Sequence, residues 1–348
     1  FAFIPIMLPF KAFGLGAIFT AAFIGGIFQI WIGKMLKPIR HMFPPLVTGI
    51  VVLMIGISLL KVGFKYAGGG VWLMNNKPEI FANWEHLLIA GTVLIVALLC
   101  NLKGKGMVSA ASILIGIIAG FVMAALLGEI RWGKIAAAGW FAFPMPFQYG
   151  IDFVWGAVIL MLFMSIVTTI ETIGDISATT MGGANREATD KELSGGIMAD
   201  GVGTAFASIF NAMPNTSYSQ NAGLVAFTGV ISRHVGTVAG VILILLGLFP
   251  KLGGIIAAMP DSVIGGAAII MFGLIAGAGI KLISKSEMSQ RNILILALSL
   301  SFGIGLYAFP EFVAHIPDFG IKLKLLLTTG LIPAGLLAFV LNATLPKK

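Results

Sequence analysis

Long stretches of this sequence contain no charged residue, and no other feature limits the possible folds so strongly. The stretch from Phe153 to Ile170, for example, has no Asp, Glu, Lys or Arg. Of the 348 residues, 58% are hydrophobic and only 10% are charged, whereas a soluble domain has about 25% charged residues. An α-helix needs about 20 apolar residues to cross a bilayer. The sequence therefore predicts a membrane protein with many helices and excludes a soluble globular domain and a disordered chain.

The apolar runs between charges, glycines and prolines predict the individual helices. At about 20 residues per crossing, the length allows roughly a dozen crossings. Two further segments, 1–10 and 213–230, are apolar but interrupted, the first by prolines and the second by a polar run, and neither is expected to form a complete helix. Ten ranges are expected to be helical: 14–33, 44–60, 86–100, 107–127, 153–181, 193–211, 235–249, 261–280, 292–309 and 323–342.

The basic residues gather in the loops on one side of this expected topology. If each segment crosses once, that side collects most of the 22 lysines and arginines, among them Lys103, Lys105, Lys281 and Arg291. Such an excess marks the cytoplasmic side of a membrane protein. Topology thus explains the net charge of +8, and binding to nucleic acid or to an acidic protein is not expected.

The single cysteine and the first residues add two limits. Cys100 is the only cysteine of the sequence, which excludes an intrachain disulfide and a metal site built from cysteines. The sequence has no initiator Met, no charged segment precedes Phe1 as it would in a signal peptide, and the first residues are apolar. We therefore expect the chain to be a fragment of a longer protein.

Three acidic residues, Glu171, Asp175 and Asp200, fall inside the expected spans. Glu171 follows the uncharged stretch described above, at a depth where an ionisable group is costly and usually functional. Asp175 lies four residues later, so the two carboxyl groups share one helical face, and in a medium of low dielectric constant both cannot ionise cheaply. No lysine or arginine lies in the same spans, which makes a reversible proton the natural counter-charge. The alternative is that one of these acids caps or braces a broken helix.

Seven consecutive polar or amphipathic residues, 215–221, lie inside an apolar neighbourhood. Backbone that is not helical survives at membrane depth only where protein buries it or where it lines a hydrated cavity. In an extended segment Thr216, Tyr218 and Gln220 would share one face, and a short helix from Gly223 would point its free N–H groups back at them. A plain loop is the alternative. Together with the interrupted first ten residues, however, this segment is typical of the midplane site of repeat-built transporters.

Residues of the same region match a family signature, which consists of Gln or Glu, Asn, any residue, Gly, four residues of any kind and Thr, with a further Gly in purine carriers. The matching residues are Gln220, Asn221, Gly223, Thr228 and Gly229. Four other stretches look familiar: ETIGDISAT at 171–179, GGIMADG at 195–201, FPPLVTGIVVLMIG at 43–56 and LFPKLGGIIAAMP at 248–260. Along essentially its whole length the chain resembles the nucleobase/ascorbate transporter family, which includes bacterial uracil, xanthine and urate permeases.

The resemblance implies an all-α polytopic membrane protein with fourteen transmembrane segments in two inverted repeats of seven. Two of the segments would consist of a half-strand and a half-helix, and this chain would lack the first two segments. Phe1 would then lie in the first half-strand and 216–221 in the second. The implied division is a substrate-binding core domain (1–42 and 150–258), a gate domain (43–149 and 259–342) and a cytoplasmic tail (343–348).

The resemblance also implies roles for the residues that match the family motifs. Glu171 would accept hydrogen bonds from ring N–H groups of the substrate, and Gln220 would bind the ring edge through its amide. Phe1 would flank the ring, and the backbone N–H groups of Phe1 and Ser219 would reach a substrate carbonyl. Three further side chains would support the core helices and proton coupling: Asp175, Asp200 and Asn221. No metal, cofactor or catalytic residue is implied, so no enzyme is expected.

Gln220 also bears on the choice of substrate. Uracil carriers resemble one another in having Glu at this position, and xanthine or urate carriers in having Gln, whose amide matches the adjacent N–H and C=O of a purine dione. We therefore expect a proton-coupled symporter that imports xanthine by alternating access through the inner (plasma) membrane, with a purine, protons and the lipid bilayer as partners. The alternatives are a urate or uracil permease and an anion exchanger of similar fold, for which Glu171 would be a poor electrostatic choice.

Two other hypotheses concern the paired acids and the glycines. An intramembrane aspartyl protease also uses paired acids, but its Gly-x-Gly-Asp pattern is absent, because Thr172 stands where the first Gly would be. The spacings Gly116 to Gly120 and Gly273 to Gly277 are compatible with close helix packing or with a homodimer.

Overall fold

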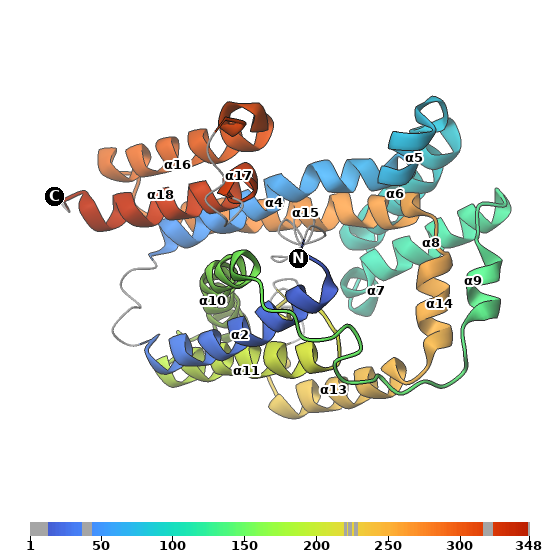
Figure 1. The fold of residues 1–348 in the computed structure, drawn as a ribbon, viewed down its shortest axis with the longest axis horizontal. Coiled ribbons are helices and arrows are strands. Elements are labelled where there is room, and N and C mark those ends of the chain that lie inside the picture. Colours follow the sequence, from blue (N-terminus) through green and yellow to red (C-terminus); the bar gives the residue numbers. More distant parts are fainter. Residues whose placement is uncertain are drawn as a thin grey trace. The chain divides into compact units, whose positions relative to one another are not determined.

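The computed structural model describes residues 13–36, 44–218, 221, 225, 229–315 and 323–346. Throughout these residues, every element of regular structure is a helix (Figure 1). The prediction of an all-α chain is therefore confirmed for the part that the structure describes.

Each of the ten ranges expected to be helical contains a helix or two short helices. Two of the ranges are broken, since 107–127 forms α7 and α8 and 323–342 forms α17 and α18. The bounds are α2 (Leu15–Lys34), α4 (Pro45–Ala67), α6 (Trp84–Lys103), α7 (Met107–Ala110), α8 (Ser112–Leu126), α10 (Trp155–Ala184), α11 (Asp190–Ile209), α13 (Arg233–Gly247), α15 (Asp261–Ile283), α16 (Gln290–Ala308), α17 (Leu323–Thr328) and α18 (Leu331–Thr344).

Helix α4 is longer than expected, because it continues past residue 60 and includes Lys61 and Lys65. The expected end was placed at the first charge. Lysine is a good helix former, however, and its long side chain can extend from an apolar helix towards the membrane surface.

Five short elements join the longer helices: α5 (Val71–Asn76), η2 (Pro78–Ile80), α9 (Trp132–Ala137), α14 (Pro250–Ala258) and η3 (Pro310–Val313). Of these, α14 was not expected to be a separate helix. Pro250 occupies its first turn, where the missing N–H group of proline costs no hydrogen bond. The chain therefore ends α13 and begins α14 with a bend of 80°.

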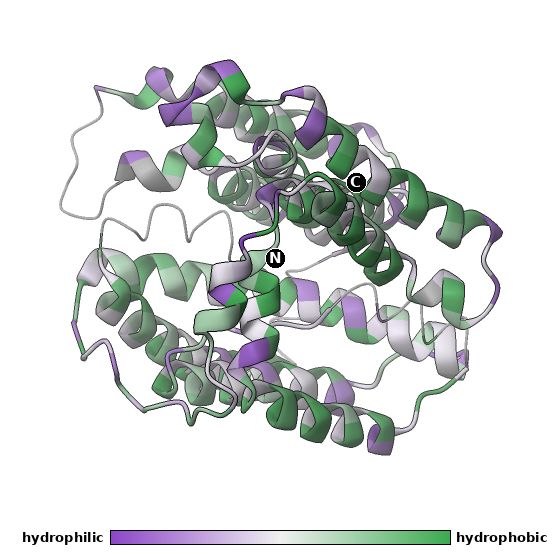
Figure 2. Cartoon of the chain, turned by 90° about the vertical axis from the view of Figure 1, so that its right-hand side faces the viewer, coloured by the Kyte–Doolittle hydropathy of each residue, from purple (hydrophilic) through white to green (hydrophobic). Residues whose placement is uncertain are grey.

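Six of the described helices, α2, α4, α6, α10, α15 and α16, are long and apolar enough to cross a membrane, and the bent pair α13 and α14 makes a seventh span if the two count as one. Hydrophobic residues dominate the helices in Figure 2. Many large apolar side chains are exposed, such as Leu243 (67%) and Ile244 (69%) of α13. Exposed apolar surface of this extent fits a lipid environment, and the chain is a multi-span membrane protein.

The chain folds as two compact units, each built from separated stretches. The first comprises Phe1–Ser58, Met145–Gly229 and Ile275–Lys348, and the second comprises Leu59–Pro144 and Val230–Leu274. This division rests on compactness alone. The expected core and gate domains are a functional division, and they stay a prediction.

In the first unit, α2 packs closely against α10 and α11 (Figure 1). At the crossing of α2 with α11, a Cβ atom added to Gly26 would lie 2.6 Å from the carbonyl oxygen of Gly201 and 2.7 Å from the backbone nitrogen of Ala205. Only glycine permits this approach, because the neighbouring atoms belong to backbone. Ser165 of α10 and Ser194 of α11 then donate hydrogen bonds to carbonyl groups of α2, across 3.0 and 2.7 Å. The three helices thus form a rigid support for the candidate site.

Candidate functional site

Helix α10 carries Glu171, Thr172 and Asp175 without interruption. Glu171 is buried, with only 5% of its surface exposed. Among the residues that the structure describes, none donates a hydrogen bond to its Oε2 atom, and no lysine or arginine forms an ion pair with it. Glu171 is thus buried inside the protein, and its expected depth in the membrane stays a prediction. A buried carboxyl group without a counter-charge needs a proton or a ligand with N–H groups.

Asp200 of α11 lies beside this face of α10. The Thr172 hydroxyl donates to Asp200 Oδ2 across 2.5 Å and so joins the two helices. Thr172 itself is buried. Asp200 is thus bonded to the residue that directly follows Glu171. Asp175 joins the same network through Ser217, as described below.

The chain leaves the helical path after α11, and residues 212–218 are neither helix nor strand. The expected interruption of this segment is confirmed, whereas its expected pairing with 1–10 lies outside the described residues. Asn215 is held by Thr204 of α11, which donates to Asn215 Oδ1 across 2.9 Å and accepts the Asn215 backbone N–H at 3.2 Å. Pro214 is buried. The segment is therefore fixed against α11 at its beginning.

Ser217 connects the same segment to α10. Its hydroxyl donates to Asp175 Oδ2 across 2.6 Å and lies 3.4 Å from Thr172 Oγ1. The Thr216 hydroxyl is buried and, like Glu171 Oε2, has no hydrogen-bond partner in the described part of the chain. These two buried groups lie near one another, beside a network that joins α10, α11 and the segment 212–218, and no hydrogen bond of normal geometry engages either atom within the described residues.

Several predicted site residues, Phe1, Ser219, Gln220, Gly223 and Thr228, lie outside the described residues. Asn221 is exposed, and its backbone N–H donates to Tyr218 O across 2.9 Å. Gly229 has a φ of +68°, which favours glycine, and its N–H donates to Val225 O across 2.8 Å. Neither contact tests the role expected for these two residues.

Three hydroxyl residues of the network were not predicted as site residues from the sequence: Thr172, Thr204 and Ser217. Thr172 directly follows Glu171, but only the rotation of α10 relative to α11 decides that its hydroxyl meets Asp200. Ser217 belongs to the predicted polar run, but the face of that run expected to be functional was the one that carries positions 216, 218 and 220. The signals in the sequence are the position of Thr172 next to Glu171, the spacing of one helical turn between Asp200 and Thr204, and the place of Ser217 in the polar run.

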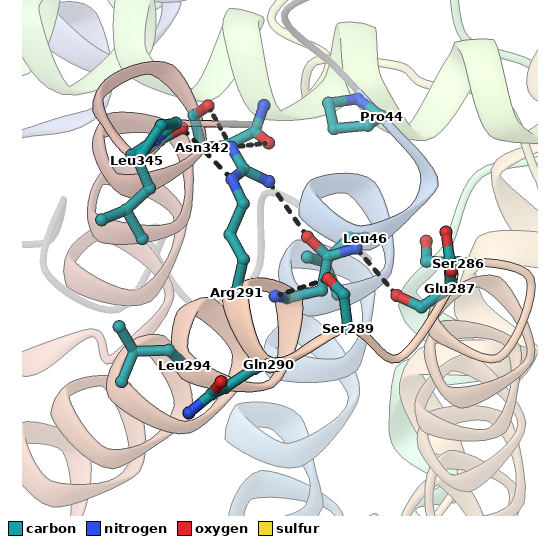
Figure 3. A pocket seen from close by; sticks show the side chains of 12 residues that line it. Pro44, Leu46, Ser286, Glu287, Ser289, Gln290, Arg291, Leu294, Asn342 and Leu345 are labelled. Carbon is teal, nitrogen blue, oxygen red and sulfur yellow. Dashed lines mark hydrogen bonds between the residues drawn. The ribbon is translucent and has the colours of Figure 1, made fainter. Parts of the chain in front are cut away.

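A polar cavity of about 630 Å³, separate from the network at Glu171, lies at the ends of α4, α16 and α18 (Figure 3). The Arg291 guanidinium at its wall donates to the carbonyl oxygens of Asn342 and Leu345, across 2.6 and 3.2 Å, and to Asn292 Oδ1 across 3.0 Å. These bonds cap the carboxyl end of α18. Because the Arg291 guanidinium is already hydrogen-bonded to protein, we interpret its role as structural: it holds the end of α18 against α16. This contact is called the clasp below.

Comparison with known proteins identifies the family of the chain. The model of a family described as the Permease family, of xanthine and uracil permeases, matches residues 1–312. A putative purine permease of Clostridium perfringens is 38% identical over 332 residues, which cover 95% of this chain and 72% of the relative. The xanthine permease XanP of Escherichia coli is 34% identical over 95% of this chain and 72% of its own length. The uric acid permease PucJ of Bacillus subtilis is also 34% identical, over 97% of this chain and 75% of its own length.

A solved structure shows the same fold. The transmembrane domain of the cyanobacterial bicarbonate transporter BicA superposes with a TM-score of 0.55, covering 92% of this chain and 76% of that domain, at 18% sequence identity. At this identity the likeness concerns the fold alone. The family match and the relatives go further: the chain belongs to the xanthine/uracil permease family and is a membrane transporter, not an enzyme.

Proposed function

We propose that this protein is a proton-coupled symporter that imports a purine nucleobase, xanthine before others, across the plasma membrane. The observation that carries the proposal is Glu171, a buried carboxyl group whose Oε2 atom accepts no hydrogen bond from the described residues. It lies beside the hydrogen-bonded network of Thr172, Asp175, Asp200 and Ser217. A carboxylate accepts hydrogen bonds from ring N–H groups, and the same group can carry a proton. One buried acid thus serves both substrate and coupling ion.

The xanthine assignment is supported by the sequence and by the named relatives. Gln220 offers a donor and an acceptor to the edge of a purine dione, and a purine permease and a xanthine permease are among the relatives. Urate is the second candidate, because the uric acid permease PucJ is as similar as XanP. A uracil permease is less well supported, since its resemblance would call for Glu at position 220.

The proposed mechanism is alternating access in a fold of fourteen segments with two inverted repeats. The core domain (1–42 and 150–258) would hold the substrate between two half-strands and move against the gate domain (43–149 and 259–342). Phe1 would lie in the first half-strand and residues 216–221 in the second, and the backbone N–H groups of Phe1 and Ser219 would donate to a substrate carbonyl. Asp175, Asp200 and Asn221 would hold the core helices and influence proton coupling.

The energy of one proton suffices for this task. A membrane potential contributes about 2.3 kcal/mol per charge per 100 mV, which corresponds to roughly 50-fold accumulation of a neutral solute carried with one proton. An anion exchanger of similar fold would gain nothing from an unpaired buried carboxyl group, because an anionic substrate would be repelled by it.

The test is uptake of labelled xanthine into proteoliposomes with and without an inward proton gradient. We expect accumulation only with the gradient, and competition by urate more strongly than by uracil, guanine or hypoxanthine. Xanthine uptake that ignores the gradient would contradict proton coupling. Competition by uracil alone would replace the purine assignment by a pyrimidine one.

A further inference from the structure

A buried amide lies on α2, outside the set of side chains described above. Gln29 is 1% exposed, and its Nε2 atom has no hydrogen-bond partner among the residues that the structure describes. The helix around it is almost entirely apolar. A buried amide without a partner is destabilising, and each such group calls for an explanation.

Contacts with α11 show at which level Gln29 lies. A Cβ atom on Gly201 would lie 2.6 Å from Gly26 O and 2.8 Å from the backbone nitrogen of Ile30. Gln29 therefore lies on α2 between the two residues that Gly201 touches. Asp200 directly precedes Gly201 on α11. Asp200 and Gln29 therefore lie at about the same height along the two packed helices.

Contacts with α10 lead to the same place. A Cβ atom on Gly16 would lie 2.7 Å from Asp152, which precedes α10, and one on Gly25 would lie 2.9 Å from Ser165 Oγ. The two helices therefore run in the same direction. Gln29 lies four residues after Gly25 on α2. On α10, the same distance beyond Ser165 leads to the next helical turn, which lies within about one turn of Thr172.

We infer that Gln29 is a positioning residue of the transport site, whose amide donates to the Asp200 carboxylate when the Thr172 hydroxyl turns away from it. An ionised carboxylate has about four acceptor positions, and Asp200 accepts from the Thr172 hydroxyl and from the Ser217 backbone N–H. A proton or substrate that arrives at the network redirects the hydroxyl group, and a partly buried carboxylate that loses one of its two donors is destabilised. The Gln29 amide then takes the place of the Thr172 hydroxyl. Its part in transport rests on the function proposed above, whereas its pairing with Asp200 does not.

Uptake assays test the part in transport. Gln29→Met keeps the volume and removes the donor, and we expect xanthine uptake to fall on the order of tenfold at equal protein in the membrane. Gln29→Asn keeps an amide and should restore part of the rate. Gln29→Glu places a second carboxyl group beside Asp200, and the two carboxyl groups then hold a proton up to a higher pH than Asp200 alone does. In a plot of uptake rate against pH, we expect the decline on the alkaline side to move upward by about one pH unit. Normal uptake by Gln29→Met with an unshifted profile of Gln29→Glu would overturn the inference.

The matched control is Ser299→Ala. Ser299 of α16 is also fully buried, with an Oγ atom that has no partner in the described part of the chain. It belongs to none of the networks at Glu171. We expect Ser299→Ala to leave both the uptake rate and its pH profile unchanged, and an equal loss in this variant would overturn the specific role of Gln29.

A double-mutant cycle on thermal unfolding separates the two proposals, measured in the purified Thr172→Val protein, where no Thr172 hydroxyl is present to donate to Asp200. If Gln29 pairs with Asp200, the loss of melting temperature in Gln29→Met/Asp200→Asn is smaller than the sum of the two single losses. Ser299→Ala with Asp200→Asn should be additive. Additive behaviour of Gln29 and Asp200 overturns the pairing whatever the protein transports. Coupling in a protein that accumulates no xanthine supports the pairing and refutes the proposed function instead.

Discussion

Ser217 Oγ donates a hydrogen bond to Asp175 Oδ2 across 2.6 Å, and this bond ties the segment that follows α11 to the helix that carries Glu171. Asp175 lies one helical turn beyond Glu171, so a displacement of the segment is transmitted to the turn that holds the buried acid. The bond therefore connects the proposed substrate position with the proposed proton carrier.

Removal of this bond should impair transport. Ser217→Ala leaves the Asp175 carboxylate without its hydroxyl donor, and hydrogen bonds to charged groups contribute about 1.5–3 kcal/mol. We expect the initial rate of xanthine uptake to fall on the order of tenfold, measured at equal protein in the membrane. Ser177→Ala is the control, because the Ser177 hydroxyl donates only to Ile173 O within α10. Equal losses in both variants would argue against a special role of Ser217.

The crossing of α2 and α11 should be intolerant of any side chain. In Gly26→Ala the new methyl group would lie 2.6 Å from Gly201 O and 2.7 Å from Ala205 N. Backbone atoms cannot yield as a side chain does, so we expect a loss of about 1–3 kcal/mol in the free energy of unfolding, seen as a lower melting temperature in detergent. Gly195→Ala on the same α11 meets nothing within 4 Å, and it should be neutral or stabilising by up to about 1 kcal/mol. A stable Gly26→Ala variant would show that the helices can separate.

The helices could be predicted from the sequence because a membrane span is a long apolar run without charged residues. The depth expected for Glu171 followed from the same uncharged run. By contrast, α14 was missed because Pro250 marks a break without showing whether a helix resumes after it. The bond from Thr172 to Asp200 could not be predicted, because it depends on the rotation of α10 against α11. That rotation is set by close contacts such as Gly196 with Ile176, which no periodicity reveals. The bond from Ser217 to Asp175 depends on the path of the segment 212–218, which is equally absent from the sequence pattern.

The amino end of α11 should give the chain an acid-sensitive contribution to stability. Arg186 and Thr189 hydrogen-bond to Glu192, ahead of the expected span, and the Arg186 guanidinium above all holds the pKa of this carboxyl group well below its usual value of 4.5. A depressed pKa in the folded state means that the stabilisation is complete above the unfolded pKa and is lost as the pH falls below it. Parent protein should therefore melt higher than Glu192→Gln at pH 7, and the difference should shrink when the pH falls below 4.5. A difference that stays constant with pH would contradict the assignment.

The helix cap at the same place allows a separate check. Thr189 and Glu192 form a capping box, in which each side chain accepts from the backbone N–H of the other. Thr189→Ala should lower the free energy of unfolding by about 1 kcal/mol. Thr189→Ser keeps the hydroxyl group and should restore the melting temperature, whereas a loss in both variants would point to packing of the threonine methyl group instead.

Arg291 should stabilise the first unit by its clasp on α18 (Figure 3). Lysine cannot form the forked set of bonds that the guanidinium makes to Asn342 O and Leu345 O. Arg291→Lys should therefore lose about 1 kcal/mol for each bond that is not replaced, measured as a lower melting temperature. Gln290→Ala changes an exposed neighbour in the wall of the same cavity and should have no effect. Wild-type melting of Arg291→Lys would show that charge alone suffices there.

Glu171 provides the most direct test of proton coupling. Glu171→Gln retains the size of the side chain and can still hydrogen-bond to a ring, but its amide cannot bind and release a proton. We expect this variant to insert into the membrane and to show no accumulation of xanthine driven by a proton gradient. Glu187→Gln is the control, because Glu187 is exposed beyond the end of α10, and it should accumulate normally. If Glu171→Gln accumulates xanthine at the parent rate, the coupling proton must be carried by another group. The Glu171 carboxyl group, whose Oε2 atom has no partner in the described part of the chain, would then serve substrate binding alone.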